Sequence, residues 1–202
     1  MTLENTFLEL QAKRRSVYIL GKDVKISDAE LTDLIQTAIK EAPTAFNNQT
    51  VRAVILFGDQ HEAAWDLVAE SLKAVATSEE AFQATLEKMA SFKAGYATVL
   101  FYTDTDVVKQ FEEQFALYAD NFYDWSEQGH GIAAYSVWLA AVTAGLGANL
   151  QHYNPLVDDK FAQAYDIPAN WRLRSQLVIG SVEVEAGDKD YLADADRFRV
   201  IK

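Results

Sequence analysis

Basic side chains that could bind an anion form two clusters, one near each end of the chain. The first is Lys13-Arg14-Arg15-Ser16, and the second consists of Arg197, Arg199 and Lys202. Arginine forks and a serine hydroxyl suit a phosphate ester, because both donate hydrogen bonds to its oxygens. The chain holds 30 acidic against 18 basic residues, so two local cationic clusters indicate a specific anionic ligand. Solvated charge, or pairing with the many carboxylates, is the competing interpretation.

A polar loop over residues 43–50 is the third candidate for ligand binding. Its side chains combine hydrogen-bond donors and acceptors, on Thr44, Asn47, Asn48 and Gln49. A flavin's pyrimidine edge or ribityl chain needs such a mixture. An ordinary polar turn is the alternative.

Several motifs that carry chemistry are missing from the sequence. It has no Walker loop, no GxGxxG, no GxSxG and no HExxH, and Gly145-Leu146-Gly147 lacks a third glycine in register. The three histidines show no metal-ligand spacing, and there is no cysteine for thiolate catalysis or a Cys-based metal site. If the protein is an enzyme, we therefore expect an organic cofactor to supply the reactivity.

Composition limits the partners. The 202 residues are 50% hydrophobic and 12% aromatic, which suits one domain with a sizeable core. The net charge of −12 makes nucleic acids and anionic membrane surfaces poor partners. The start of the chain has no secretory signal pattern, so a cytoplasmic protein is expected. The apolar stretch over 132–146 is shorter than the roughly 20 residues of a membrane span.

The spacing of apolar residues predicts a series of helices. We expect the first over 3–20, with Phe7, Leu10 and Val17 near one face. A capping box at 27–30 begins the second, which must end before Pro43. Asp59 and Ser78 are expected to cap the next two. Further helices are predicted over 105–125, 130–145 and 155–165.

Strands are expected over 51–58, 97–102 and 173–184, with a short strand or loop over 146–153 and a short extended segment over 197–201. Few strands and many helices in mixed order predict an α+β fold, with a sheet wrapped by helices. The helix over 130–145 has almost no polar face, so it must be covered on nearly all sides. A dimer interface would supply the missing surface; an ordinary central core helix is the alternative.

Four segments together resemble the nitroreductase family. Arg14-Arg15-Ser16 resembles its Arg-x-Ser opening, and Pro43-Thr44-Ala45-Phe46-Asn47-Asn48-Gln49 resembles its Pro-Ser-x-x-Asn-x-Gln loop. The segment from Gly145 to Pro155 is similar to the one after the family's long central helix, and Arg197-Phe198-Arg199 is similar to its basic end. The order and spacing of the four segments agree with those of the family over nearly the whole chain. The amino-acid sequences of the second and third segments are most similar to those of a subgroup with short chains from lactic-acid bacteria and fungi.

The resemblance implies a mixed sheet wrapped by helices, in an intertwined homodimer with a swapped C-terminal arm and two FMN molecules at the interface. Arg14 and Ser16 would hold the phosphate with Arg199 and, as a further candidate, Arg197, while Arg15 would approach the ribityl chain or the pyrimidine ring. Leu150-Gln151-His152 would pass the isoalloxazine and present a backbone N–H to N5, and Lys93 or Lys88 would reach the pyrimidine edge. The partner subunit would contribute Pro43, Thr44, Ala45, Asn47 and Gln49. Gln151-His152 replaces the Glu-Gly pair of many members, which leaves the N5 donor open.

The implied activity is a ping-pong oxidoreduction. NAD(P)H would reduce FMN, and a nitroaromatic, quinone or similar small aromatic acceptor would then take the electrons in the same place. The residues Phe46, Phe111, Tyr118, Phe122, Tyr123 and Trp125 are candidate walls for a flat substrate, with simple core packing as the alternative. Three other interpretations stay open: a flavin enzyme with another reaction, a flavin-binding redox or stress-response regulator, and a structural domain without cofactor.

Overall fold

A single antiparallel sheet forms the centre of the protein. The computed structural model describes residues 6–202, and five strands of this part pair in the order β1–β5–β3–β2, with β4 also pairing with β5. The strands are β1 (Leu20–Gly21), β2 (Val51–Phe57), β3 (Ala97–Asp104), β4 (Gly147–Gln151) and β5 (Trp171–Val182). The parallel element of the sheet is an isolated bridge between Ser16 and Ala148. The α+β fold predicted from the sequence is thereby confirmed.

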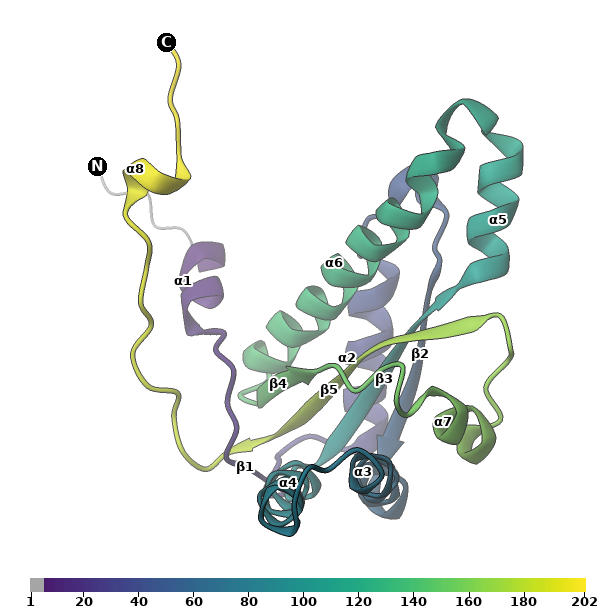
Figure 1. The fold of residues 1–202 in the computed structure, drawn as a ribbon. Coiled ribbons are helices and arrows are strands. Elements are labelled where there is room, and N and C mark those ends of the chain that lie inside the picture. The colour runs from purple at the N-terminus through teal and green to yellow at the C-terminus, as the bar shows by residue number, and fades with distance from the viewer. Residues whose placement is uncertain (1–5) are drawn as a thin grey trace.

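Helices cover both faces of the sheet (Figure 1). The helices are α1 (Thr6–Lys13), α2 (Asp28–Lys40), α3 (Gly58–Lys73), α4 (Glu79–Lys93), α5 (Thr105–Gln114), α6 (Phe122–Thr143), α7 (Asp158–Tyr165) and α8 (Asp194–Arg197), with 3₁₀ turns η1 (Ala45–Asn47) and η2 (Ala116–Asn121). One hydrophobic core joins α2 and α6 to the sheet, and a second joins α3, α4 and α7 to its other face. Alternate residues of β3 enter the two cores: Phe101 packs toward α6 and Leu100 toward α3.

Local capping chemistry explains where two of the helices begin. Ser27 and Glu30 exchange hydrogen bonds as predicted, with Ser27 N–H donating to Glu30 Oε2 at 2.9 Å. Ser78 Oγ caps α4 by accepting from Ala81 N–H at 3.1 Å. The expectation that Asp59 caps α3 is wrong, because the chain turns directly from β2 into the helix at Gly58, whose φ is +51°.

The predicted helix over 3–20 is too long. Residues 1–5 lie outside the described part, and α1 ends at Lys13. Beyond it the chain is extended, because Val17 N–H donates to Ala148 C=O at 3.0 Å and draws this turn to β4. A long-range backbone pairing therefore overrides the local helical spacing.

Four further features differ from expectation. The helix predicted over 105–125 is broken at Phe115, whose φ of −124° and ψ of 57° end α5. This break lets Phe115 pack against Phe46, with ring centroids 4.7 Å apart and the rings tilted. Helix α6 accordingly begins at Phe122 rather than near 130. Helix α7 begins at Asp158 instead of 155, and Arg197 ends a short helix instead of lying in an extended segment.

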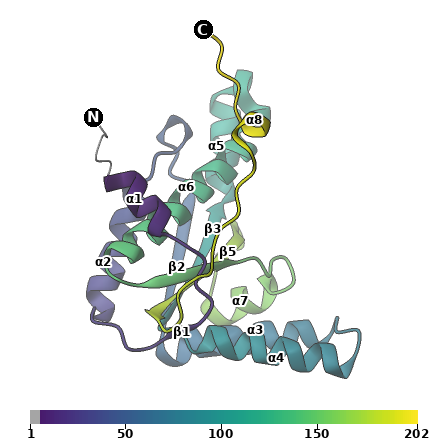
Figure 2. The same cartoon turned by 90° about the vertical axis from the view of Figure 1, so that its left-hand side faces the viewer.

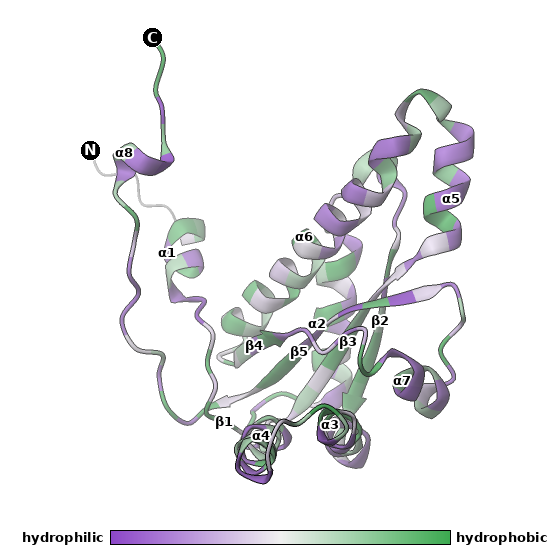
Figure 3. Ribbon diagram, in the orientation of Figure 1, coloured by the Kyte–Doolittle hydropathy of each residue, from purple (hydrophilic) through white to green (hydrophobic). Residues whose placement is uncertain are grey.

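The C-terminal segment projects from the sheet and its helices, whereas α1 lies beside α6. Helix α1 and the segment 183–202, which we call the C-terminal arm, extend to the same side (Figures 1 and 2). Hydrophobic residues line the central strands and recur along this arm (Figure 3), and Tyr191, Phe198, Val200 and Ile201 are exposed there. Among the described residues, no helix is long and apolar enough to span a membrane.

Candidate functional site

The first basic cluster lines a cavity of about 560 Å³. Arg14, Arg15 and Ser16 form one wall, and residues 184–189 of the C-terminal arm form the other. The arm is held beside this turn by Glu183 N–H, which donates to Ile19 C=O at 3.1 Å. Residues far apart in the sequence thus enclose a space with three hydrogen-bonding side chains on one wall.

Arg14 is positioned to receive an anion. Its guanidinium lies 4.5 Å from the Trp138 ring centroid, and its Nε is buried without a partner among the described residues. A buried charged donor without an acceptor costs free energy, so this atom favours a ligand that supplies an oxygen. Arg15 is bound only weakly, at 3.4 Å from Asp188 C=O. Both guanidinium groups therefore retain donors for a ligand.

Strand β4 carries the predicted ring-binding segment along an edge of the sheet. One edge of β4 pairs with β5. At the other edge of β4, Ala148 C=O accepts a hydrogen bond from Val17 N–H. Because successive residues of an antiparallel strand direct their N–H groups to opposite edges, the N–H of Leu150 faces the same outer edge as Ala148. Gln151 turns its side chain inward and donates to Asn149 Oδ1 at 2.8 Å, whereas His152 is exposed.

The polar loop has a fixed and unusual backbone. Phe46, Asn47 and Gln49 have positive φ values of 54°, 51° and 47°. Such values are uncommon outside glycine and often mark functional loops. Thr44 stabilises the turn by accepting from Gln49 N–H at 3.0 Å. Thr44 and Gln49 also line a cavity of about 170 Å³ at the end of α2.

The loop and the basic turn lie at different positions along α6. Thr44 packs at Gly129, where an added Cβ would be 3.3 Å from its methyl group, while Arg14 packs on Trp138. Gly129 and Trp138 are nine positions apart on the helix, which corresponds to about 14 Å of rise. None of the described loop residues, Pro43, Ala45 and Asn47 included, lines the cavity of the basic turn. Within one protomer the structure does not bring these two predicted parts of the site together.

The two candidate lysines have different surroundings. Lys93 Nζ forms an ion pair with Asp66 of α3 at 2.8 Å. Lys88 Nζ lies 5.7 Å from the ring centroid of Tyr153, which directly follows His152. Lys88 is therefore the lysine placed beside the β4 segment.

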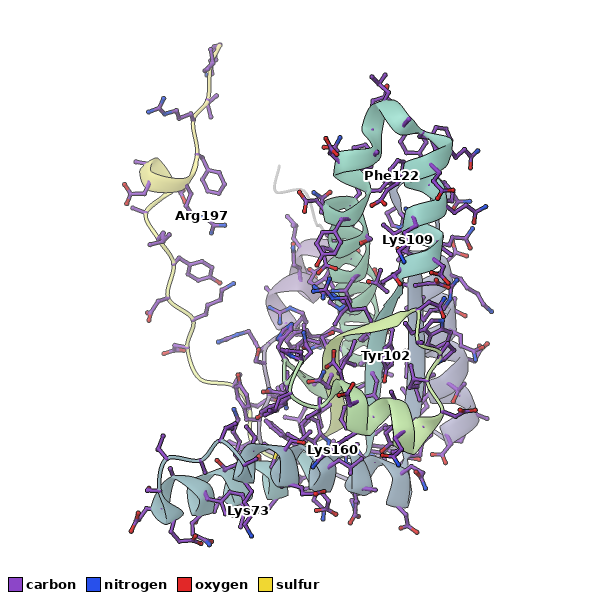
Figure 4. The ribbon with its side chains drawn as sticks, turned by 45° about the vertical axis from the view of Figure 1, so that its right-hand side comes forward. Lys73, Tyr102, Lys109, Phe122, Lys160 and Arg197 are labelled. Carbon is purple, nitrogen blue, oxygen red and sulfur yellow. The ribbon has the colours of Figure 1, made fainter. Side chains whose placement is uncertain are left out.

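The second basic cluster lies on the outer part of the C-terminal arm. Arg197 and Arg199 are exposed, and neither lines the cavity of Arg14. Figure 4 shows Arg197 on the part of the arm that extends away from the helices. Lys189, which sequence reasoning missed, does line that cavity and also a neighbouring one with Arg14 and Tyr135. Lys189 lies between Asp188 and Asp190, so the sequence shows no basic cluster there. Only the path of the arm brings it to Arg14.

Aromatic side chains of α5, η2 and α6 gather around Phe46. The ring of Phe46 lies 4.7 Å from Phe115, 5.5 Å from Phe122 and 5.9 Å from Trp125, measured between centroids. Phe122 is fully buried, but Phe46 and Tyr118 are 48% and 43% exposed. Tyr123, also a predicted wall residue, lies apart from this group, because its hydroxyl accepts from Arg172 Nη1 at 2.6 Å. The group is thus partly core and partly a surface available for a flat ligand or another subunit.

His130 is a buried histidine of α6 facing β5. Its Nε2 lies 2.7 Å from Ser175 Oγ, and the residue is 8% exposed. Burial, with a smaller effect of His152, lowers the pKa of His130 to about 4. The imidazole is therefore neutral near pH 7.

We predict that His130 makes the protein sensitive to acid. Since its pKa in the folded protein lies below the unfolded value of about 6.5, the unfolded chain binds the proton first. The corresponding stability is complete above about pH 6.5 and is lost as the pH falls to about 4, by on the order of 3 kcal/mol. Urea unfolding between pH 7 and 4 should show a shallower pH dependence for His130→Gln than for wild type.

The exposed His152→Gln is the control and should keep most of the wild-type slope, because burial lowers the pKa of His130 more than His152 does. His61, whose pKa is also lowered by burial, leaves a residual slope in both variants. Equal slopes for His130→Gln and wild type would contradict the prediction.

The protein thus has an α+β fold, with a basic turn that lines a cavity beside the outer edge of β4 and a polar loop at another position along α6. Residues 12–181 match the model of the Nitroreductase family. The chain therefore belongs to the nitroreductase family, as the four segments predicted.

Individual relatives agree with this assignment. Nitroreductase FRM2 of Saccharomyces cerevisiae is 33% identical over 184 residues, which cover 89% of this chain and 90% of that protein. Nitroreductase CinD from Lactococcus lactis, solved in complex with nicotinic acid, is 48% identical with a TM-score of 0.90, covering 97% of this chain and 100% of that one. A Desulfovibrio desulfuricans protein solved in complex with FMN shares the fold, with a TM-score of 0.70 at 20% identity over 98% of this chain and 99% of that one. The bacterial and yeast relatives confirm the predicted subgroup.

Proposed function

We propose that this protein is an FMN-dependent oxidoreductase that takes electrons from NAD(P)H and reduces nitroaromatics, quinones or similar small acceptors. The observation that carries the proposal is the cavity in which Arg14, with its unpaired buried Nε, meets Arg15 and Ser16 beside the outer edge of β4. A cytoplasmic location and a single domain over 1–202 remain predictions that accompany it.

The residues present fit FMN. The Arg14 guanidinium and the Ser16 hydroxyl suit its phosphate, and Arg15 suits the ribityl chain or the pyrimidine ring. The N–H of Leu150 on the β4 edge suits a ring acceptor atom such as N5. Lys88, beside Tyr153, is the favoured lysine for the pyrimidine edge. FMN, when bound, supplies the capacity to accept a hydride and to give electrons to a second substrate. The protein's part is to bind and orient the reactants and to provide fixed donors and positive charge.

A homodimer would complete the site. The polar loop lies about 14 Å along α6 from the basic turn of its own protomer, so a partner's loop is the better source of Thr44, Asn47 and Gln49. The arm likewise carries exposed apolar side chains away from its own core, which favours burial against a partner. In this arrangement the swapped arms bring Arg197 and Arg199 to a phosphate held by Arg14 and Ser16.

Flat aromatic acceptors fit the remaining features. CinD has been solved with nicotinic acid, with chloramphenicol and with 4-nitrophenol, each of which contains an aromatic ring. Here the exposed aromatic group around Phe46 offers stacking surfaces for similar molecules. The two substrates would use the same face in turn, which is the basis of a ping-pong cycle.

Anaerobic stopped-flow spectroscopy of the FMN-loaded protein tests the proposal. We expect NADH or NADPH to bleach the flavin absorbance, and 4-nitrophenol or a quinone to restore it in a separate mixing step. Parallel double-reciprocal plots would support ping-pong turnover. Bound flavin that no nicotinamide nucleotide reduces would contradict enzymatic function and favour a regulatory flavoprotein. A protein that binds no FMN would contradict both.

A further inference from the structure

We propose that Asn149 is a positioning residue that fixes the basic turn in register with β4. The inference rests on the proposed function, because it concerns how the phosphate and ring portions of the FMN site are held relative to each other. Asn149 is fully buried in the middle of β4.

Both polar atoms of the Asn149 amide are used within the protein. Its Nδ2 donates to Val17 C=O at 2.8 Å, across 132 positions of sequence. Its Oδ1 accepts from Gln151 Nε2, also at 2.8 Å. The amide is thus oriented by Gln151, on the same face of β4, so that its donor faces the turn that carries Arg14, Arg15 and Ser16.

A second hydrogen bond between Val17 and β4 fixes the position of the basic turn along the strand. Val17 N–H donates to Ala148 C=O at 3.0 Å, so both polar groups of the Val17 backbone are bound by consecutive residues of β4. Val17 directly follows Ser16, and two bonds at this point define the position of the turn along the strand more narrowly than one. The proposed phosphate donors and the proposed ring-facing N–H of Leu150 are therefore linked through Asn149.

The surrounding sheet should tolerate the loss of this contact. Strand β4 pairs with β5 over 147–151, and these backbone bonds do not depend on the Asn149 side chain. Replacing the amide would leave the Val17 carbonyl buried without its donor, which favours movement of the turn. The consequence should appear at the phosphate more than at the ring.

Asn149→Asp is the most informative variant. It keeps the shape and the acceptor for Gln151 but replaces the donor to Val17 by an oxygen that repels the carbonyl. Asn170→Asp is the matched control, because Asn170 Nδ2 also donates to a single acceptor, Asp104 Oδ1 at 2.8 Å, remote from the basic turn. Asn149→Ser, whose side chain is too short to reach Val17, replaces the aspartate variant in the test if that variant does not fold.

The test compares FMN with riboflavin, which lacks the phosphate, by titration of the flavin-free protein. We expect Asn149→Asp to weaken FMN binding by about tenfold or more and riboflavin binding much less, since the turn that loses its buried partner carries the proposed phosphate donors. Asn170→Asp should leave the ratio of the two dissociation constants unchanged. Equal weakening of both flavins, or no change, would overturn the positioning role.

Hydrogen exchange separates this inference from the proposed function. In the flavin-free protein, Asn149→Asp should speed exchange of the Val17 amide while amides paired between β4 and β5 keep their protection. Unchanged Val17 protection would overturn the inference even if FMN binds. Failure of the wild-type protein to bind FMN would instead contradict the proposed function, and the exchange result would stand.

Discussion

Replacing both Arg14 and Arg199 by alanine should weaken FMN binding by about 3–6 kcal/mol, or roughly a hundredfold to ten-thousandfold. Hydrogen bonds to charged groups contribute about 1.5–3 kcal/mol each, and the two residues sit at opposite ends of the sequence. Arg14 already lines the cavity, with a buried Nε that lacks a partner among the described residues. Arg199 would arrive on the swapped arm. Fluorescence titration of the flavin-free variant gives the dissociation constant directly.

A charge-matched control is available on another part of the molecule. Lys73 on α3 and Lys160 on α7 lie away from the arm that bears Arg197 (Figure 4), so Lys73→Ala with Lys160→Ala changes the net charge equally. This control should keep wild-type FMN affinity, and riboflavin should bind the arginine variant nearly as well as the wild type. Full flavin retention by the arginine variant would show that the phosphate lies elsewhere.

Truncation after Asp196 should impair both dimerisation and cofactor retention. The deletion removes Arg197 and Arg199 together with Phe198, Val200 and Ile201, which are 59%, 81% and 94% exposed in the single chain. If a partner buries these three apolar side chains, each contributes about 1.5–3 kcal/mol to association. Sedimentation velocity over a concentration series should show dissociation to monomers that the full chain does not undergo.

Two smaller changes show whether the apolar side chains or the arginines cause each effect of the truncation. Val200→Ser with Ile201→Ser keeps both arginines and should weaken dimerisation first. Arg197→Ala with Arg199→Ala keeps the apolar side chains and should weaken FMN binding first. An unchanged sedimentation coefficient for the truncated chain would rule out the arm crossing to a partner.

Local sequence rules anticipated the elements whose boundaries depend on nearby residues. The capping box at Ser27 and the cap at Ser78 follow from side chains that reach the first free N–H groups of their own helix. The strands β2, β3 and β5 follow from short apolar runs that a sheet with helices on both faces must bury. The same rules misjudged the turn at 14–17 and the break at Phe115, because contacts with Ala148 and Phe46 decide them.

The sequence alone determined the chemical inventory: which side chains can bind an anion, which motifs are absent, and which family the four segments resemble. Those properties depend on residue types and their order. Only the tertiary structure decided that Arg14 keeps an unpaired Nε, that Lys88 rather than Lys93 faces Tyr153, and that Asn149 ties Val17 to β4. These contacts join residues separated by up to 132 positions. Local conformational preferences do not specify which distant side chains meet when the helices pack on the sheet.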